Sequence, residues 1–184
     1  MKNIVTLLTL SRIVIAPLLF ILIVFFQNFG WAFIFFLAAS ITDYLDGFLA
    51  RKYNATSIIG EILDPIADKV IVIFLLFALS MQLNSFFIAF AGATMVSRDI
   101  WVNGVREFNA RLLQAERTKV TFLAKIKTSI QMVSISSYLL ALFFGNTFLL
   151  FISNFLLFLA LIISLRTGLE YTTNSMQSQE DKIS

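Results

Sequence analysis

The sequence predicts an all-α, polytopic integral membrane protein with six transmembrane helices and a polar cavity facing the cytoplasm. Hydrophobic residues make up 59% of the 184 positions, and the mean hydropathy is +0.88. Charged residues make up only 14%, against about a quarter in soluble domains. Three long stretches contain no Asp, Glu, Lys or Arg: 13–42, 70–97 and 128–165. Because one span needs about 20 apolar residues, each stretch is long enough for a helical hairpin.

A short polar or turn-prone patch interrupts each charge-free stretch once. The patches are 27–30 (Gln-Asn-Phe-Gly), 82–85 (Gln-Leu-Asn-Ser) and 145–146 (Gly-Asn). Residues of these types end apolar helices and favour turns. We therefore expect three helical hairpins, each of which turns at its patch.

The arms of the first hairpin, 13–26 and 31–42, are too short to cross a bilayer alone. They must include polar residues at their other ends, among them Arg12, Asp43 and Asp46. At about 1.5 Å per residue, Asp43 and Asp46 then lie about 18 and 22 Å from the outer boundary.

The second hairpin in the same way takes in Asp64, Asp68, Arg98 and Asp99 at its polar ends. The same count places Asp68 about 20 Å and Asp64 about 26 Å from the outer boundary. Two acidic pairs on neighbouring helices are therefore expected at similar depth, in the cytoplasmic half of the membrane.

Basic residues indicate the topology. None of the 14 Lys and Arg residues lies in a turn patch, and six of them lie between residues 106 and 127. By the positive-inside tendency, both termini and that segment face the cytoplasm, in the cell (inner) membrane. Lys2 precedes an apolar run, as in a signal peptide, but the run is too long and lacks an Ala-x-Ala cleavage pattern. We interpret it as a retained first span.

The third hairpin completes one transmembrane domain over residues 1–171. The polar segment 172–184 is expected to be a disordered tail. A net charge of +3 is weak evidence for binding to nucleic acid, and no such partner is expected.

The chain contains neither cysteine nor histidine, which limits the chemistry of any site. Zinc sites of the Cys/His type, haem, thiol catalysis and histidine general bases are excluded. The spacings of three residues from Asp43 to Asp46 and four from Asp64 to Asp68 place each pair on one helix face. Two converging pairs of carboxylates form an oxygen cage for one or two divalent cations. The alternative is an ion-pair network in which the acids pair with Arg51, Lys52, Lys69 and Arg98.

Small residues accompany the acidic pairs. Gly47 follows Asp46, Gly60 precedes the second pair, and Ala50 keeps the same helix wall low. Glycine destabilises a helix by about 1 kcal/mol relative to alanine, but it lets a ligand or a neighbouring backbone approach closely. Tight packing of helices is the alternative explanation. A cation such as Arg51 beside a carboxylate–metal cluster favours a phosphate or pyrophosphate ligand.

The segment Asp43-Tyr-Leu-Asp46-Gly47-Phe-Leu-Ala50-Arg51, followed by Gly60, Asp64 and Asp68, has the form D-x2-D-G-x2-A-R-x8-G-x3-D-x3-D. It resembles the complete signature of the CDP-alcohol phosphatidyltransferases, with all eight defining positions at the right spacing. The resemblance implies six spans, a homodimer and two divalent metal ions, Mg²⁺ or Mn²⁺. It also implies a reaction that displaces CMP from a CDP-linked lipid or alcohol.

Three further segments resemble the phosphatidylglycerophosphate synthase branch of this family. They are Asn3 to Arg12 with Pro17, Ser97 to Glu107, and Ala124 to Gln131, with Asp99 in place of the usual Glu and Ala124 in place of Gly. The resemblance runs from about Asn3 to Gln131, and the last two spans match in hydrophobicity alone. It implies transfer of the phosphatidyl group from CDP-diacylglycerol to glycerol 3-phosphate, in phosphatidylglycerol and cardiolipin biosynthesis.

The resemblance also implies a role for each site residue. Asp43, Asp46, Asp64 and Asp68 would bind the metal ions, and Asp68 would accept the proton of the acceptor hydroxyl. Gly47, Ala50 and Gly60 would make room for the cytidine of CDP-diacylglycerol, with Arg51 on its phosphate. Arg98, Arg106, Lys125 and Lys127 would bind the acceptor phosphate. Arg111, Arg117 and Lys119 are better explained as contacts to anionic lipid headgroups.

Two alternatives stay open from the sequence. One is another transferase of the same family, with phosphatidylglycerol, inositol phosphate or serine as acceptor. The other is a divalent-cation transporter, because paired intramembrane carboxylates also suit ion passage. The outer halves of the spans carry no charge, which argues against a route for ions across the membrane.

Overall fold

The computed structural model consists of six α-helices in the part of the chain that it describes. The helices are α1 (Lys2–Val24), α2 (Phe29–Lys52), α3 (Ile58–Gln82), α4 (Phe86–Arg111), α5 (Phe122–Phe144) and α6 (Thr147–Glu180). The described backbone covers residues 2–52, 58–111 and 122–180, and the described side chains are those of residues 10–42, 63, 66–111 and 122–175. The predicted all-α class is confirmed.

The three predicted turns are confirmed, and the residues that form them also begin the next helices. Gln27, Asn84 and Gly145 have positive φ angles of 49°, 46° and 62°, one in each turn. Directly after Gly145, the Asn146 side-chain oxygen accepts hydrogen bonds from the backbone N–H groups of Phe148 and Leu149, at 2.9 and 3.2 Å. Such a cap satisfies N–H groups that have no partner within the helix.

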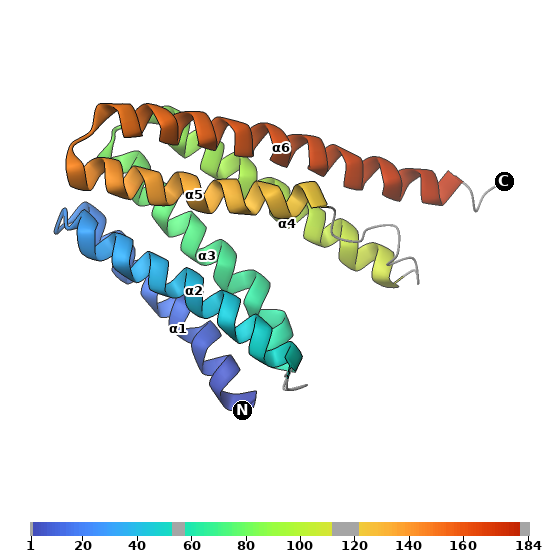
Figure 1. Cartoon of the computed structure of the whole chain (residues 1–184). Coiled ribbons are helices and arrows are strands. Elements are labelled where there is room, and N and C mark those ends of the chain that lie inside the picture. The colour runs from blue at the N-terminus through green and yellow to red at the C-terminus, as the bar shows by residue number, and fades with distance from the viewer. Residues whose placement is uncertain (1, 53–57, 112–121, 181–184) are drawn as a thin grey trace.

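The helices form two groups that share one end (Figure 1). Helix α1 packs against α2 and α3, and α6 packs against α4 and α5. Contacts of α3 with α4 and of α2 with α5 join the groups. The helices lie close together at the end that carries the three tight turns, and the groups spread apart toward the other end (Figure 1).

Apolar and small residues fill the space between the helices. The core includes Leu19, Ile23, Phe36, Leu75, Leu79, Ile88, Leu139 and Leu157, together with alanines of several helices. Gly92 allows a close approach of α4 to α3, because a Cβ at this position would lie 3.2 Å from Cβ of Leu76. Small residues at helix contacts are typical of membrane bundles.

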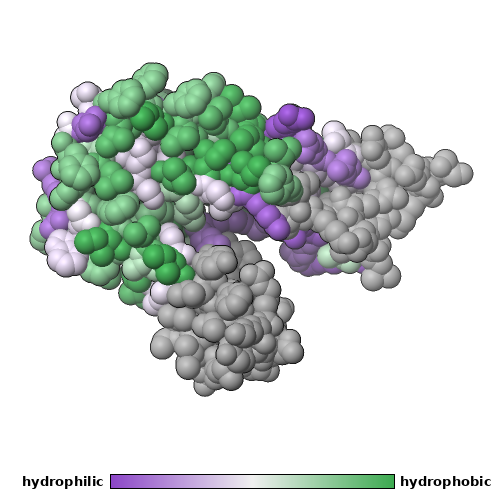
Figure 2. All heavy atoms as spheres, in the orientation of Figure 1, coloured by the Kyte–Doolittle hydropathy of each residue, from purple (hydrophilic) through white to green (hydrophobic). Residues whose placement is uncertain are grey.

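The outer surface is also strongly apolar, with exposed phenylalanines such as Phe25, Phe86 and Phe151 (Figure 2). Two helical segments, Phe122–Phe144 and Thr147–Ser175, are long and apolar enough to cross a membrane by length and composition. Shorter apolar segments, Leu10–Val24 and Phe29–Thr42, lie in the first two helices.

Helix α6 continues past the polar boundary at residue 171 and ends at Glu180. Trp101 Nε1 donates a hydrogen bond to Thr172 Oγ1 at 3.0 Å, and Asn109 Nδ2 donates one to Ser175 Oγ at 3.0 Å. The predicted disorder is therefore wrong for residues 172–175, which hold α6 against α4. Residues 181–184 of the predicted tail lie outside the described part.

Candidate active site

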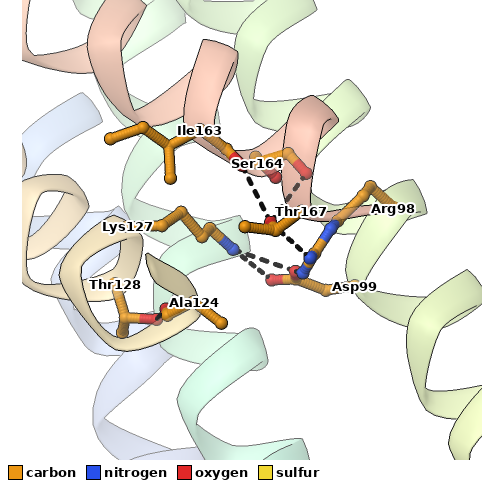
Figure 3. A network of polar contacts seen from close by, with 8 residues as sticks. All are labelled: Arg98, Asp99, Ala124, Lys127, Thr128, Ile163, Ser164 and Thr167. Atoms are coloured by element: carbon orange, nitrogen blue, oxygen red, sulfur yellow. Dashed lines mark hydrogen bonds and ion pairs between the residues drawn. The ribbon is translucent and has the colours of Figure 1, made fainter. Parts of the chain in front are cut away.

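A partly buried ionic cluster lies where α4, α5 and α6 meet (Figure 3). Lys127 Nζ donates hydrogen bonds to both carboxylate oxygens of Asp99, at 2.9 Å to Oδ1 and 2.7 Å to Oδ2. Arg98 Nη1 donates to the same Oδ1 at 2.8 Å. The side chain of Lys127 is 3% exposed. One carboxylate thus holds two cations together and leaves the cluster with a net positive charge.

Helix α6 supplies further contacts to Arg98. Its Nη2 donates a hydrogen bond to Thr167 Oγ1 at 2.6 Å (Figure 3). Its guanidinium carbon also lies 5.7 Å from the ring centroid of Tyr171, within the range of a cation–π interaction. The guanidinium is therefore held between α4, its own helix, and α6.

A small cavity of about 150 Å³ opens onto this cluster. Its charged lining residues are Lys69, Arg98, Asp99, Arg106 and Lys127. Four cations and one carboxylate give a formal net charge of +3. Arg98 and Arg106 are eight residues apart on α4, close to two helical turns, which is why both reach the same cavity. A cavity of this size and charge suits a phosphate group.

A second cavity of about 190 Å³ adjoins the first, since Lys69, Asp99 and Lys127 line both. Asp68 of α3 and Gln131 of α5 also line this second cavity. Asp68 lines a third cavity as well, of about 370 Å³, which α1, α2, α3 and α5 enclose. Figure 2 shows hydrophilic side chains in a hollow at the edge of the apolar surface. Asp68 thus lies between the second and the third cavity, and the second cavity separates it from the cationic cluster.

Asp68 is bound by a buried arginine. Arg12 Nη1 donates a hydrogen bond to Asp68 Oδ1 at 2.7 Å, and the side chains are 2% and 46% exposed, respectively. The ion-pair network that the sequence offers as an alternative pairs the acids with cations other than Arg12. Arg12, one partner of Asp68, is on α1, and it holds the carboxylate while leaving it accessible from the cavities.

Most of the signature residues lie on described backbone, but their side chains are outside the described part. Asp43, Asp46, Gly47, Ala50 and Arg51 belong to α2, and Gly60 and Asp64 belong to α3. The predicted arrangement of the four carboxylates therefore stays a prediction. The described side chains contain no group of three or more acids, histidines or cysteines that could hold a metal ion.

The four basic residues predicted to bind the acceptor phosphate do not all reach one cavity. Arg98, Arg106 and Lys127 line it, whereas Lys125 does not and is exposed. Residues two apart on a helix point in different directions, which separates Lys125 from the buried Lys127.

Sequence reasoning named Lys69 as an ion-pair partner of the acids and not as a lining residue of this cavity, and it missed Thr167 and Tyr171. A signal for the last two was present in the final apolar stretch. Ser164, Thr167, Gly168 and Tyr171 follow the i, i+3, i+4, i+7 spacing of one helix face. Hydroxyls and a glycine on one face of an apolar helix indicate a contact with a polar group on another helix.

Comparisons with known proteins show what the chain is similar to. The family model described as CDP-alcohol phosphatidyltransferase matches residues 2–166. The chain is 35% identical over 173 residues to a protein of Salmonella choleraesuis (strain SC-B67) that is named CDP-diacylglycerol--glycerol-3-phosphate 3-phosphatidyltransferase. It is 37% identical over 174 residues to a protein of the same name from Wigglesworthia glossinidia brevipalpis. Each alignment covers 92% of this chain and 92% of the relative.

Proposed function

Because this chain belongs to the CDP-alcohol phosphatidyltransferase family, we propose that it transfers the phosphatidyl group of CDP-diacylglycerol to glycerol 3-phosphate and releases CMP. Such a reaction contributes to the synthesis of phosphatidylglycerol. The single observation that carries the choice of acceptor is the cavity with a formal net charge of +3, next to the cavity that Asp68 lines.

The acceptor is proposed to lie across the two adjoining cavities. Its phosphate occupies the cationic cavity, where Lys69, Arg98, Arg106 and Lys127 neutralise its charge. Its glycerol part extends through the second cavity, so that a hydroxyl faces Asp68. An acceptor with no negative charge would leave the net positive charge of this pocket uncompensated.

Asp68 is proposed to accept the proton of that hydroxyl. The hydroxyl oxygen attacks the phosphorus that carries the diacylglycerol, the bond from this phosphorus to the bridging oxygen breaks, and CMP leaves. The chain has no histidine, and Asp68 lines both the second and the third cavity, which supports this role. Arg12 holds one of its oxygens at a fixed position.

Asp43, Asp46, Asp64 and Asp68 are proposed to bind divalent metal ions, two Mg²⁺ or Mn²⁺ per site. Four carboxylates without a cysteine or histidine in the chain form a donor set that fits a hard cation. When bound, the ions neutralise the pyrophosphate of CDP-diacylglycerol and the leaving CMP. Gly47, Ala50 and Gly60 are proposed to leave space for the cytidine, and Arg51 to bind phosphate.

The six helices are proposed to cross the membrane, with the charged end on the cytoplasmic side. The turn patches at the opposite end carry no charged residue. In this orientation the acyl chains of the lipid substrate remain in the bilayer, and the phosphates reach the site from the headgroup region.

The test is a reconstitution of the purified protein in vesicles with labelled CDP-diacylglycerol and a set of acceptors. The acceptors are glycerol 3-phosphate, glycerol, inositol phosphate, serine and phosphatidylglycerol. We expect release of CMP and formation of a labelled lipid with glycerol 3-phosphate, and little product with glycerol. Equal or faster transfer to another acceptor would overturn the proposed acceptor while leaving the family in place.

A further inference from the structure

Three residues on one face of α6 meet the side chain of Arg98. Thr167 accepts its hydrogen bond, Tyr171 lies under its guanidinium, and Gly168 lies against its aliphatic part. The side chain of Arg98 is 11% exposed. Contacts with α6, the last helix, therefore set much of the position of Arg98 in the cationic cavity.

The hydroxyl of Thr167 is oriented to receive Arg98. Its Oγ1 donates to the backbone carbonyl oxygens of α6, at 2.8 Å to Ile163 and 3.1 Å to Ser164 (Figure 3). Because the hydroxyl proton is used inside α6, a lone pair of the oxygen faces Arg98 Nη2 at 2.6 Å. Valine has nearly the same shape as threonine but offers no oxygen to accept the hydrogen bond of Arg98.

Gly168 provides the space that Arg98 occupies. A Cβ at this position would lie 2.9 Å from Cγ of Arg98 and 3.1 Å from its Nε. Any side chain at residue 168 would therefore push Arg98 away from α6. The buried Nε of Arg98 has no hydrogen-bond partner among the described residues, so contact with Gly168 takes the place of a polar contact there.

We propose that α6 is part of the acceptor site, and that Thr167 and Gly168 are positioning residues that hold Arg98 against the acceptor phosphate. This inference rests on the proposed function and adds a role for the last helix. Contacts of α4 with α6 beyond this point, between Trp101 and Thr172 and between Asn109 and Ser175, do not involve Arg98. They keep the two helices aligned when Thr167 is altered.

The first test is steady-state kinetics with both substrates varied, on Thr167→Val and Thr167→Ser. We expect Thr167→Val to raise the KM for glycerol 3-phosphate about three- to tenfold, less than the roughly ten- to hundredfold for loss of a charge-assisted hydrogen bond to the phosphate itself, because Thr167 acts through Arg98. The KM for CDP-diacylglycerol should stay within about twofold. Thr167→Ser keeps the hydroxyl oxygen that accepts the hydrogen bond of Arg98, so its KM for glycerol 3-phosphate should be parental. A parental acceptor KM in Thr167→Val, or equal rises for both substrates, would overturn the inference.

Thr173→Val is the matched control. Thr173 is exposed on the same helix, and its hydroxyl also donates to carbonyl oxygens of α6, at 3.1 Å to Leu169 and 3.1 Å to Glu170. The variant Thr173→Val loses the same type of hydroxyl at a residue that does not contact Arg98 among the described interactions, so both KM values should be parental. A rise in acceptor KM equal to that of Thr167→Val would show a general effect on the helix and count against the positioning role.

The second test is Gly168→Ala against Gly104→Ala. Gly104 lies on α4, and an added Cβ there would have no described atom within 4 Å apart from its chain neighbours and its own helix backbone, so its substitution should leave both KM values unchanged. Gly168→Ala should raise the acceptor KM at least as much as Thr167→Val does. Thermal unfolding in detergent is measured beside the kinetics. If Gly168→Ala unfolds at a lower temperature than the parent, the kinetics of Thr167→Val alone test the positioning role.

A double-mutant cycle distinguishes this inference from the proposed function. In an Arg98→Ala background, Thr167→Val should change the acceptor KM no further, because the group it positions is absent. An additive rise would show that Thr167 acts by another route. If the parental enzyme does not use glycerol 3-phosphate at all, the proposed function fails, whatever the variants do.

Discussion

Arg12 of α1 donates a hydrogen bond to Asp68 of α3 at 2.7 Å, across 56 positions of sequence. The guanidinium is buried, whereas nearly half of the aspartate side chain is exposed to the cavities. A buried arginine can hold a carboxylate in a fixed direction only when the geometry is good, because taking the charge out of water is costly. The pair therefore connects the first helix to the residue that we propose as the proton acceptor.

The first prediction is that Arg12→Ala lowers kcat more than it raises either KM. Loss of one charge-assisted hydrogen bond is worth about 1.5–3 kcal/mol, or about ten- to hundredfold. Steady-state kinetics on the reconstituted protein measures the effect. Arg166→Ala is the control, because Arg166 is exposed and pairs only with Glu170 of the same helix, at 3.3 Å, among the interactions described. Surface pairs of this kind contribute little. A parental kcat in Arg12→Ala would show that Asp68 does not depend on this contact.

The second prediction separates Asp68 from the other three acids. Activity should disappear in excess chelator and return with Mg²⁺ or Mn²⁺, since the proposed ligands are all carboxylates. Asp43→Asn, Asp46→Asn and Asp64→Asn should weaken metal binding and turnover together. Asp68→Asn should abolish transfer while binding of CDP-diacylglycerol is largely kept.

Binding of labelled CDP-diacylglycerol, measured beside turnover, distinguishes the two classes of variant. Glu170→Gln changes a half-buried acid on α6 that lies outside the proposed site, and it should leave both unchanged. Full activity of the parent in excess chelator would remove the metal site from the proposal. Near-parental turnover in Asp68→Asn would assign the proton to another group.

The sequence predicted the helices and turns well because local chemistry decides them. Charge-free stretches are helical, and Gln27, Asn84 and Gly145 adopt positive φ at the predicted turns. The sequence does not predict the extent of α6, because polarity after residue 171 indicates disorder when composition alone is considered. The hydroxyls of Thr172 and Ser175 there accept hydrogen bonds from α4, which is a tertiary contact that composition does not reveal.

The residues around the candidate site could likewise be predicted from the sequence only in part. Helical spacing placed Arg98 and Arg106 on one side of α4, and both line the same cavity. The sequence predicts the same role for Lys125 and Lys127, although a separation of two residues on a helix points them apart. The pairing of Arg12 with Asp68 depends on the packing of α1 against α3, which no local pattern determines.

The third prediction concerns the packing of α3 against α4. Gly92→Val should destabilise the protein by about 1–3 kcal/mol, because added side-chain atoms overfill a well-packed contact. Even its Cβ would lie 3.2 Å from Cβ and 3.3 Å from Cδ1 of Leu76. Thermal unfolding in detergent measures the change. Gly104→Ala, which adds a methyl group in open space, should be neutral or stabilise by up to about 1 kcal/mol. An unchanged melting temperature for Gly92→Val would show that the two helices separate easily.

The fourth prediction concerns the acceptor phosphate and compares two lysines of α5. Lys127 is buried and lines the cationic cavity, whereas Lys125 is exposed and does not. Lys127→Ala should raise the KM for glycerol 3-phosphate about ten- to hundredfold, with little change in the KM for CDP-diacylglycerol. Lys125→Ala should change the acceptor KM by less than about threefold, as expected for an exposed charge.

Free glycerol provides the decisive comparison for this fourth prediction. The parent should strongly prefer glycerol 3-phosphate, because only that acceptor neutralises the cavity. In Lys127→Ala the preference should shrink, since part of the site that recognises the phosphate is gone. If Lys127 only stabilised the fold through Asp99, both acceptors and CDP-diacylglycerol would be affected alike, and the ratio between the acceptors would stay at its parental value. Steady-state kinetics with each acceptor measures this ratio, and an unchanged ratio would move the phosphate site away from this cavity.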